Sequence, residues 1–279
     1  MNAHLTEIRD KQKQTWNSFS GGWKKWDSLT MDFLKPWADE IIRMVAPKAG
    51  DTALDVAAGT GEPGLTIAKM IGSGKVIITD LAEGMIVTAR EKVEESGFKN
   101  VETLACDVSD LPFDDNTFDV ISCRFGFMFF PDMNLAASEL YRVLKPGGRI
   151  AVAVWGKPED NFWATAFQSV VAKHLELPHP PPGAPGLFRC AEPTVMKDIF
   201  TQTGFKNIAE TQIAGPFPFE SSAQYWDFMS EVVAPVAFIS QSDEIKESIR
   251  KEVMATIDSK FPTGKVVVGA SGFVIFGEK

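Results

Sequence analysis

Short apolar segments alternate with longer helical segments from about residue 50 to residue 155. This alternation is typical of a parallel sheet wound with helices, because each parallel strand needs a crossover before the next strand begins. The pattern predicts an α/β fold with a Rossmann-like, doubly wound and mostly parallel sheet. We expect its strands at residues 52–56, 75–79, 101–105, 118–123 and 149–155.

The regular alternation of strands and helices fades after residue 155. Residues 158–200 combine aromatic side chains with a run of prolines and glycines, which indicates an inserted cap. We expect a further strand at 206–213, helices within 220–260, and one or two antiparallel strands at 265–277 that complete a seven-stranded sheet at its edge. Four parts follow: an N-terminal helical lid segment (1–45), a core (46–156), an inserted helical cap (157–203), and the remaining strands with their helical insertion (204–279).

Composition and charge narrow the class of protein. The net charge of −9 and the absence of a basic stripe disfavour nucleic acid as a partner. No apolar run approaches the roughly 18 residues of a membrane span, and the polar start lacks a secretory signal, so we expect a cytoplasmic protein. The scattered Cys106, Cys123 and Cys190 indicate neither disulfides nor a metal site. Nothing in the sequence fixes the oligomeric state.

The strongest chemical signal is a glycine turn directly after the first predicted strand, Leu54-Asp-Val-Ala-Ala-Gly-Thr-Gly-Glu-Pro-Gly64. Glycines at such a turn let the backbone approach a ligand closely. Gly59-Thr-Gly-Glu-Pro-Gly64 also fits the dinucleotide pattern G-x-G-x-x-G, so NAD and S-adenosylmethionine compete for this loop.

Three neighbouring features favour S-adenosylmethionine. Asp55 would oppose a pyrophosphate but suits the ammonium group of a cationic ligand. Pro63 removes one of the N–H donors on which pyrophosphate binding depends. Asp80 and Asp107 end the next two strands, where they could accept from the ribose hydroxyls and the adenine amino group. The alternative is that Asp80 and Asp107 are helix N-caps.

At this point the sequence resembles the class I methyltransferases, and more closely the branch of the ubiquinone and menaquinone C-methyltransferases. The resemblance rests on Leu54 to Gly61, Asp80, Cys106-Asp-Val108, Leu111-Pro-Phe-Asp-Asp-Asn-Thr-Phe-Asp119 and Tyr141-Arg-Val-Leu-Lys-Pro-Gly-Gly148. It covers about residues 16–155. One departure is that Ala57 and Ala58 stand where the family usually has glycine and another small residue, so we expect an ordinary negative φ there.

The resemblance implies S-adenosyl-L-methionine as cofactor, with S-adenosyl-L-homocysteine as product. It places the methionine end on the glycine turn, the ribose and adenine between the second and third strand ends, and Arg124, in Ser122-Cys-Arg-Phe-Gly126, near the methyl group. The implied cofactor residues are Asp55, Ala57, Ala58, Gly59, Thr60, Gly61, Asp80, Leu81, Met85, Cys106, Asp107, Val108 and Arg124.

Aromatic residues dominate the part of the predicted site that would bind the methyl acceptor. Trp16, Phe19, Trp23 and Trp26 form a helical stripe interrupted by two glycines, which indicates packing on the core, a lid over the site, or both. With Phe125, Phe127, Trp155 and Trp163 they predict a largely apolar pocket for a small-molecule acceptor. The candidates for a catalytic group are Arg124, His174 and His179, because a base is needed only if the acceptor must lose a proton.

These patterns predict methyl transfer to a small apolar or aromatic acceptor, on carbon or oxygen. Three alternatives stay open: an N-methyltransferase of a small amine, an NAD-dependent oxidoreductase, and a non-catalytic cofactor-binding protein.

Overall fold

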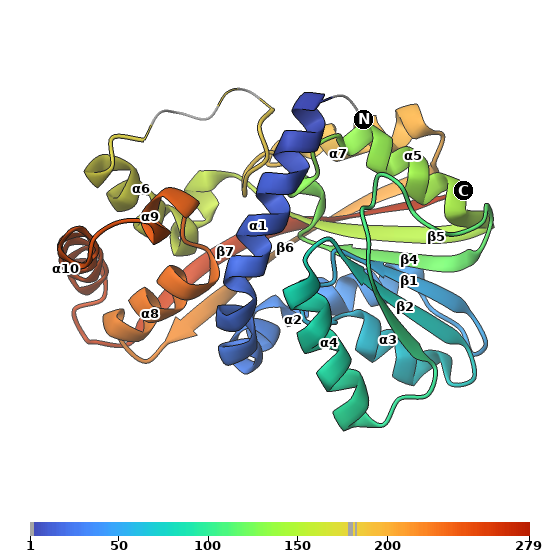
Figure 1. Ribbon diagram of the computed structural model, residues 1–279, viewed down its shortest axis with the longest axis horizontal. Helices are drawn as coiled ribbons and strands as arrows, with labels where there is room; N and C mark the ends of the chain where they lie inside the picture. Colours follow the sequence, from blue (N-terminus) through green and yellow to red (C-terminus); the bar gives the residue numbers. More distant parts are fainter. Residues whose placement is uncertain (1–2, 178–180, 182) are drawn as a thin grey trace.

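A single seven-stranded sheet, in the order β3-β2-β1-β4-β5-β7-β6, organises the chain. The computed structural model describes residues 3–177, 181 and 183–279. Strands β1 to β5 pair in parallel, and β7 lies antiparallel between β5 and β6. Helices flank this sheet on both faces (Figure 1). The predicted Rossmann-like, mostly parallel fold is thereby confirmed.

The strands are β1 (Thr52–Val56), β2 (Lys75–Asp80), β3 (Val101–Ala105), β4 (Phe118–Arg124), β5 (Leu144–Trp155), β6 (Lys206–Phe219) and β7 (Val266–Glu278). The α-helices are α1 (Ala3–Lys25), α2 (Asp27–Val45), α3 (Gly64–Ile71), α4 (Glu83–Ser96), α5 (Met133–Val143), α6 (Phe162–His174), α7 (Pro193–Thr203), α8 (Ser222–Val232), α9 (Val236–Ile239) and α10 (Asp243–Lys260), with short 3₁₀ turns η1 (Phe127–Phe129) and η2 (Pro158–Asp160).

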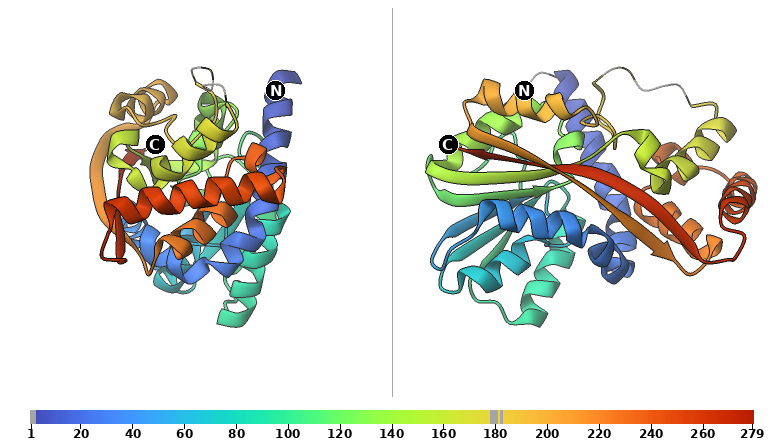
Figure 2. Two further views of the ribbon diagram at one scale, coloured as in Figure 1. Left: turned by 90° about the vertical axis from the view of Figure 1, so that its left-hand side faces the viewer. Right: turned by 180° about the vertical axis from the view of Figure 1, so that it is seen from behind.

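Strand β6 is longer than the sequence pattern predicts, whereas β7 has the expected length. β6 continues to Phe219, six residues beyond the expected end, and β7 is one continuous strand. β7 pairs with β5 only as far as Gly272, but it pairs with β6 to Val266. The β6–β7 ribbon therefore projects past the parallel sheet (Figure 2). It contacts α6 and α8, and α10 packs against these two helices.

The predicted cap, residues 157–203, contains the two helices α6 and α7. α7 contacts α5 and both strands of the β6–β7 ribbon, whereas α6 contacts β7 and also packs against α10 and α8. We therefore propose that the cap comprises α6 together with α8 to α10, and that α7 belongs to the core. The remainder of the four-part division stays a prediction.

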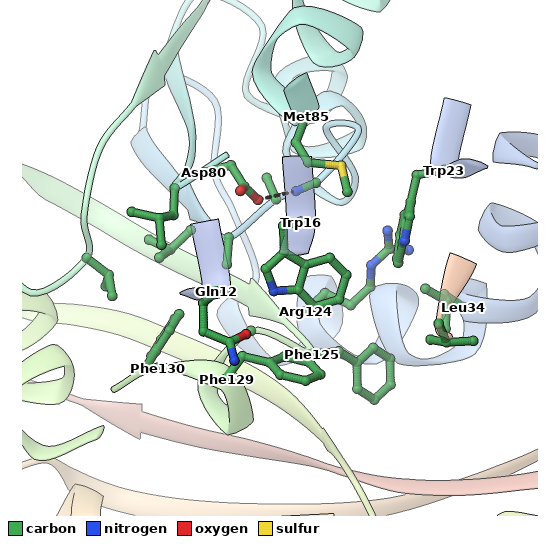
Figure 3. A pocket seen from close by; sticks show the side chains of 18 of the residues that line it. Gln12, Trp16, Trp23, Leu34, Asp80, Met85, Arg124, Phe125, Phe129 and Phe130 are labelled. Atoms are coloured by element: carbon green, nitrogen blue, oxygen red, sulfur yellow. Dashed lines mark hydrogen bonds between the residues drawn. The ribbon is translucent and has the colours of Figure 1, made fainter. Parts of the chain in front are cut away.

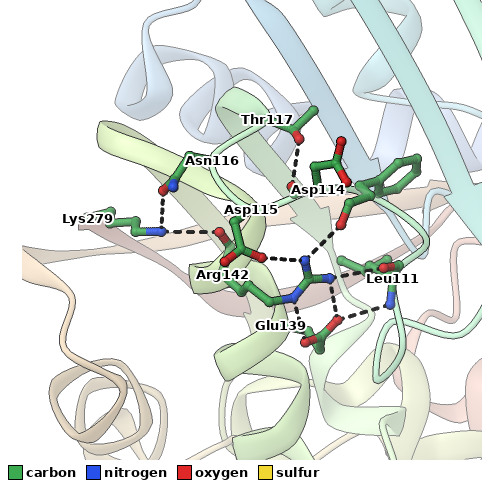
Figure 4. A network of polar contacts seen from close by, with 9 residues as sticks. Leu111, Asp114, Asp115, Asn116, Thr117, Glu139, Arg142 and Lys279 are labelled. Carbon is green, nitrogen blue, oxygen red and sulfur yellow. Dashed lines mark hydrogen bonds and ion pairs between the residues drawn. The ribbon is translucent and has the colours of Figure 1, made fainter.

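Two of the motifs on which the family resemblance rests, residues 111–119 and 141–148, contribute to one polar network. This network lies before β4, away from the carboxyl end of that strand. The guanidinium of Arg142 donates to the carbonyl oxygens of Leu111 and Phe113 and to the carboxylates of Asp115 and Glu139 (Figure 4). Glu139 in turn accepts from the Leu111 N–H at 3.1 Å. Because Arg142 satisfies several backbone groups of the loop, these motifs fix how the chain enters β4.

No helix in the described part of the chain is both long and apolar enough to cross a membrane.

Candidate functional site

One large cavity opens at the carboxyl ends of β1, β2 and β4, beneath α1 (Figure 3). It contains about 1180 Å³ of space between protein atoms, part of it open to solvent. Most of the wall is apolar and aromatic, and a few charged groups interrupt it.

The glycine turn forms the floor of the cavity at the end of β1. Gly59 has φ +56°, a left-handed conformation that glycine adopts without steric cost, and a Cβ added there would lie 3.9 Å from the ring of Trp23. Ala57 also has a positive φ, +50°, so the prediction of an ordinary turn at this residue is wrong. The reason is tertiary: the Ala58 N–H donates to the Thr79 carbonyl at 3.0 Å and anchors the turn to β2.

Asp80, at the end of β2, is 9% exposed and lines the cavity. Its carboxylate accepts from the Gly59 N–H and from the Ala82 N–H, each at 2.9 Å. Burial raises the pKa of Asp80, and the N–H groups of Ala82, Gly59 and Leu81 oppose that rise. Asp80 thus ties the glycine turn to the second strand end, and the residue at the N-cap of α4 is Ala82.

Asp107 lines the same cavity beyond β3. Its carboxylate accepts from the Ser109 N–H at 2.8 Å and lies 3.8 Å from the guanidinium of Arg9 in α1. No helix begins within the described residues 107–117, so Asp107 is not a helix cap. The N-cap alternative therefore fails for both aspartates.

Asp55 is fully buried and is not among the residues that line the cavity. Its carboxyl group bonds to the Ser122 hydroxyl at 2.6 Å and accepts from the Gly64 N–H at 2.8 Å. Burial raises its pKa to about 7, against the opposing effects of Ser122, Gly64 and Arg124. Asp55 therefore holds together β1, β4 and the start of α3, beneath the turn.

Helix α1 roofs the cavity and lies between α4 and α8 (Figure 1). Its Lys13 and Lys24 pair with Glu83 and Glu91 of α4. In its last turn, the Trp23 indole also donates to the Val232 carbonyl of α8 at 3.2 Å. Trp16 and Trp23, one heptad apart, both line the cavity. The predicted stripe is thus both a packing surface and a roof.

α1 and α8 can pack closely because residue 22 is a glycine and has no side chain. A Cβ added there would lie 2.0 Å from the Glu231 carbonyl oxygen, whereas one added at Gly21 meets nothing within 4 Å. We expect Gly22→Ala to lower the free energy of unfolding by about 1–3 kcal/mol through overpacking. Gly21→Ala should raise it by about 0.5–1 kcal/mol, because alanine favours the helix. Urea unfolding of both variants tests this, and equal midpoints would contradict the docked position of α1.

Of the predicted cofactor residues, ten line the cavity, namely Ala57, Ala58, Gly59, Asp80, Leu81, Met85, Cys106, Asp107, Val108 and Arg124. The other three lie behind the wall: Asp55, Thr60 and Gly61. The Thr60 hydroxyl donates to Asp27 of α2 at 2.7 Å, so it fastens the turn to the second helix.

Among the predicted aromatic residues, Trp16, Trp23, Phe125, Trp155 and Trp163 line the cavity. Three others point elsewhere. Phe19 is buried beside Trp16, and the Trp26 indole donates to Glu231 at 2.7 Å. Phe127, in the turn η1, packs against Phe130 and Phe200.

The one histidine candidate within the described residues, His174, lies away from the cavity. His174, at the end of α6, pairs with Glu252 of α10 at 2.7 Å and does not line the cavity. His179 lies outside the described residues. Of the two catalytic candidates in the described part of the chain, Arg124 lines the cavity and His174 does not.

The sequence patterns missed much of the acceptor wall. Phe33 and Leu34 of α2 and Phe228 and Val232 of α8 line the cavity, and so do Phe129 and Phe130 after β4. Phe33 stacks on Trp155 at a centroid distance of 5.8 Å. The helical spacing of apolar residues in α2 marks a buried face, but it does not show that this face borders a cavity.

The chain belongs to the ubiE/COQ5 methyltransferase family, whose model matches residues 10–178. The cofactor of this class of protein is S-adenosylmethionine, as predicted. Two relatives, a ubiquinone/menaquinone biosynthesis C-methyltransferase of Teredinibacter turnerae and a demethylmenaquinone methyltransferase of Bacillus subtilis, are each 36% identical. The matches cover 47% and 48% of this chain and 53% and 58% of those proteins, so they span about half the length of each.

Solved structures share the fold at lower identity. The YcgJ protein of Bacillus subtilis is 20% identical with a TM-score of 0.56, over 87% of this chain and 97% of that one. The [4+2]-cyclase SpnF is 18% identical with a TM-score of 0.54, over 87% and 80%. Because one of these neighbours is described as a cyclase, the fold alone does not fix the reaction.

Proposed function

We propose that this protein transfers a methyl group from S-adenosylmethionine to a small apolar or aromatic acceptor, on carbon or oxygen. The observation that carries the proposal is that one cavity joins the glycine turn, Asp80 and Asp107 to an aromatic chamber. Cofactor and acceptor would therefore meet within a single cavity.

The cavity wall fits the cofactor. The turn Ala57 to Gly59 presents backbone without bulky side chains, Asp80 offers acceptors for the ribose hydroxyls, and Asp107 offers one for the adenine amino group. Leu81, Met85 and Val108 provide apolar surface for the adenine ring. The cofactor supplies an electrophilic methyl carbon on a sulfonium centre. The chain's contribution is then alignment and exclusion of water, for which the roof of Trp16 and Trp23 is suited.

The acceptor chamber favours a flat apolar molecule. Phe125 stacks on Trp155 at 3.9 Å, and Trp163 tilts against Trp155 at 4.9 Å. Phe33, Phe228 and Leu34 add further apolar surface. The relatives whose names specify demethylmenaquinone or ubiquinone biosynthesis support an aromatic or prenylated acceptor of the quinol type.

A panel of acceptors tests this proposal with radiolabelled S-adenosylmethionine. We expect label transfer to phenols or to quinols with an apolar substituent, and none to small polar amines of similar size. Because an apolar chamber gains affinity from buried hydrocarbon, removing an apolar substituent should raise KM. Turnover of an amine with no turnover of any phenol or quinol would contradict the proposed acceptor class.

A further inference from the structure

The apolar cavity contains two buried hydrogen-bond donors that the fold leaves without a proper acceptor. Arg124, at the end of β4, is 7% exposed, and Thr30, in α2, is 2% exposed. Both line the cavity. Arg124 and Thr30 belong to different elements, and the fold brings them to the same cavity wall.

Arg124 has no ion-pair partner within 4 Å among the described residues. Arg124 Nη2 donates a hydrogen bond to the thioether sulfur of Met31 at 3.2 Å. A thioether is a weak acceptor. Burial lowers the pKa of Arg124, while Asp55, Glu62 and Asp27 raise it from a distance. Burying a guanidinium without an ion-pair partner costs folding free energy, and a bound anion would offset this cost.

Thr30 supports the same conclusion independently. Its hydroxyl is buried without any hydrogen-bond partner, and it is the cavity-lining residue with this property in the described part of the chain. Buried polar groups in folded proteins are almost always hydrogen-bonded, so the Thr30 hydroxyl needs a polar partner within the cavity, which a ligand oxygen would provide. Figure 3 shows Arg124 extending between Trp16 and Trp23, into the space that a ligand would fill.

We propose that Arg124 and Thr30 form an anion subsite that binds a carboxylate. This inference rests on the proposed function, and it adds the chemistry that the site selects. Two ligands could supply the carboxylate: the methionine part of the cofactor, or an acidic substituent on the acceptor. A guanidinium suits both, because it donates two parallel hydrogen bonds to a carboxylate.

Two matched pairs of probes distinguish these sources by calorimetry. The first pair is S-adenosylhomocysteine and its decarboxylated analogue, the adenosyl thioether of 3-aminopropane. The second pair is 1-hydroxy-2-naphthoate and 1-naphthol, titrated with and without saturating S-adenosylhomocysteine. Within each pair only the carboxylate differs. The variants are Arg124→Met and Thr30→Val, and the control is Arg149→Met, because Arg149 lies at the other end of the sheet and outside the cavity.

The wild-type protein should prefer the carboxylate-bearing member of one pair by about 10- to 150-fold, the range expected for a charge-assisted hydrogen bond. Arg124→Met should abolish that preference, and Thr30→Val should reduce it by about 2- to 10-fold. Loss of the preference in the first pair identifies the cofactor carboxylate as the ligand, and loss in the second pair identifies an acidic acceptor. Unchanged preferences in both pairs would overturn the proposal.

The melting temperature of Arg124→Met distinguishes a ligand-binding role of Arg124 from a structural role. Arg124→Met removes an uncompensated buried charge, so its melting temperature without ligand should not fall below that of the wild type. A lower melting temperature with unchanged probe selectivity would assign Arg124 a purely structural role. Failure of the wild-type protein to bind S-adenosylhomocysteine would contradict the proposed function, and the naphthoate pair without cofactor would still test the subsite.

Discussion

Replacing Asp80 with alanine is expected to weaken the binding of S-adenosylhomocysteine by about 5- to 150-fold, or roughly 1–3 kcal/mol. Two losses combine in this variant. The carboxylate no longer accepts from the ribose hydroxyls, and the Gly59 N–H loses its partner at 2.9 Å, so the glycine turn is free to move. Calorimetric titration of the purified variant measures the effect.

Asp51 provides the matched control for this experiment. It also accepts a backbone hydrogen bond, from the Lys48 N–H at 2.8 Å, but it precedes β1 and lies at the opposite end of the sheet. Asp51→Ala should bind S-adenosylhomocysteine with unchanged affinity. If Asp80→Ala also retained wild-type affinity, Asp80 would not be part of the cofactor site.

The second large effect is a dependence of stability on pH that comes from Asp55. Burial raises the pKa of its carboxyl group to about 7 in the folded protein, well above the value of about 3.9 in an unfolded chain. Between these values the folded state holds the proton and the unfolded state releases it, so stability falls as pH rises from about 4 to about 7. An asparagine side chain at this position would mimic the protonated acid, because it can both donate to Ser122 and accept from Gly64.

We therefore expect Asp55→Asn to gain stability relative to the wild type as pH rises, by up to about 4 kcal/mol at pH 8, with little relative change below pH 4. Urea unfolding across this range measures it. Asp119→Asn is the control with the opposite sign: burial acts to raise the pKa of Asp119, but Lys145 and the Thr52 N–H lower it. That variant should be less stable than the wild type above pH 4. A constant difference between Asp55→Asn and the wild type would contradict the raised pKa.

The parallel strands and the cofactor floor could be predicted because their signals are local. β1, β2 and β3 begin where the apolar segments begin, and the glycine turn follows β1 directly. Asp80 and Asp107 follow the next two strands along the chain, and parallel topology brings these ends together. The same reasoning placed Asp55 in the site, but its side chain points beneath the turn, and strand alternation does not reveal that choice.

The acceptor wall could not be predicted, because it depends on contacts between distant elements. Phe33 and Phe228 reach the cavity only because α2 and α8 converge on the same end of the sheet. Trp26 belongs to the aromatic stripe, yet α1 ends at Lys25 and the chain turns, so the Trp26 ring packs on Phe228 outside the cavity. The positive φ of Ala57 has a similar origin, since the anchoring Thr79 carbonyl lies on a different strand.

The most direct test of this account is a calorimetric titration of the wild-type protein with S-adenosylhomocysteine, run beside NAD on the same sample. We expect micromolar binding of S-adenosylhomocysteine and no binding of NAD, because Asp80 and Asp107 line a cavity whose turn offers no full set of N–H donors for a pyrophosphate. Binding of NAD alone would contradict it.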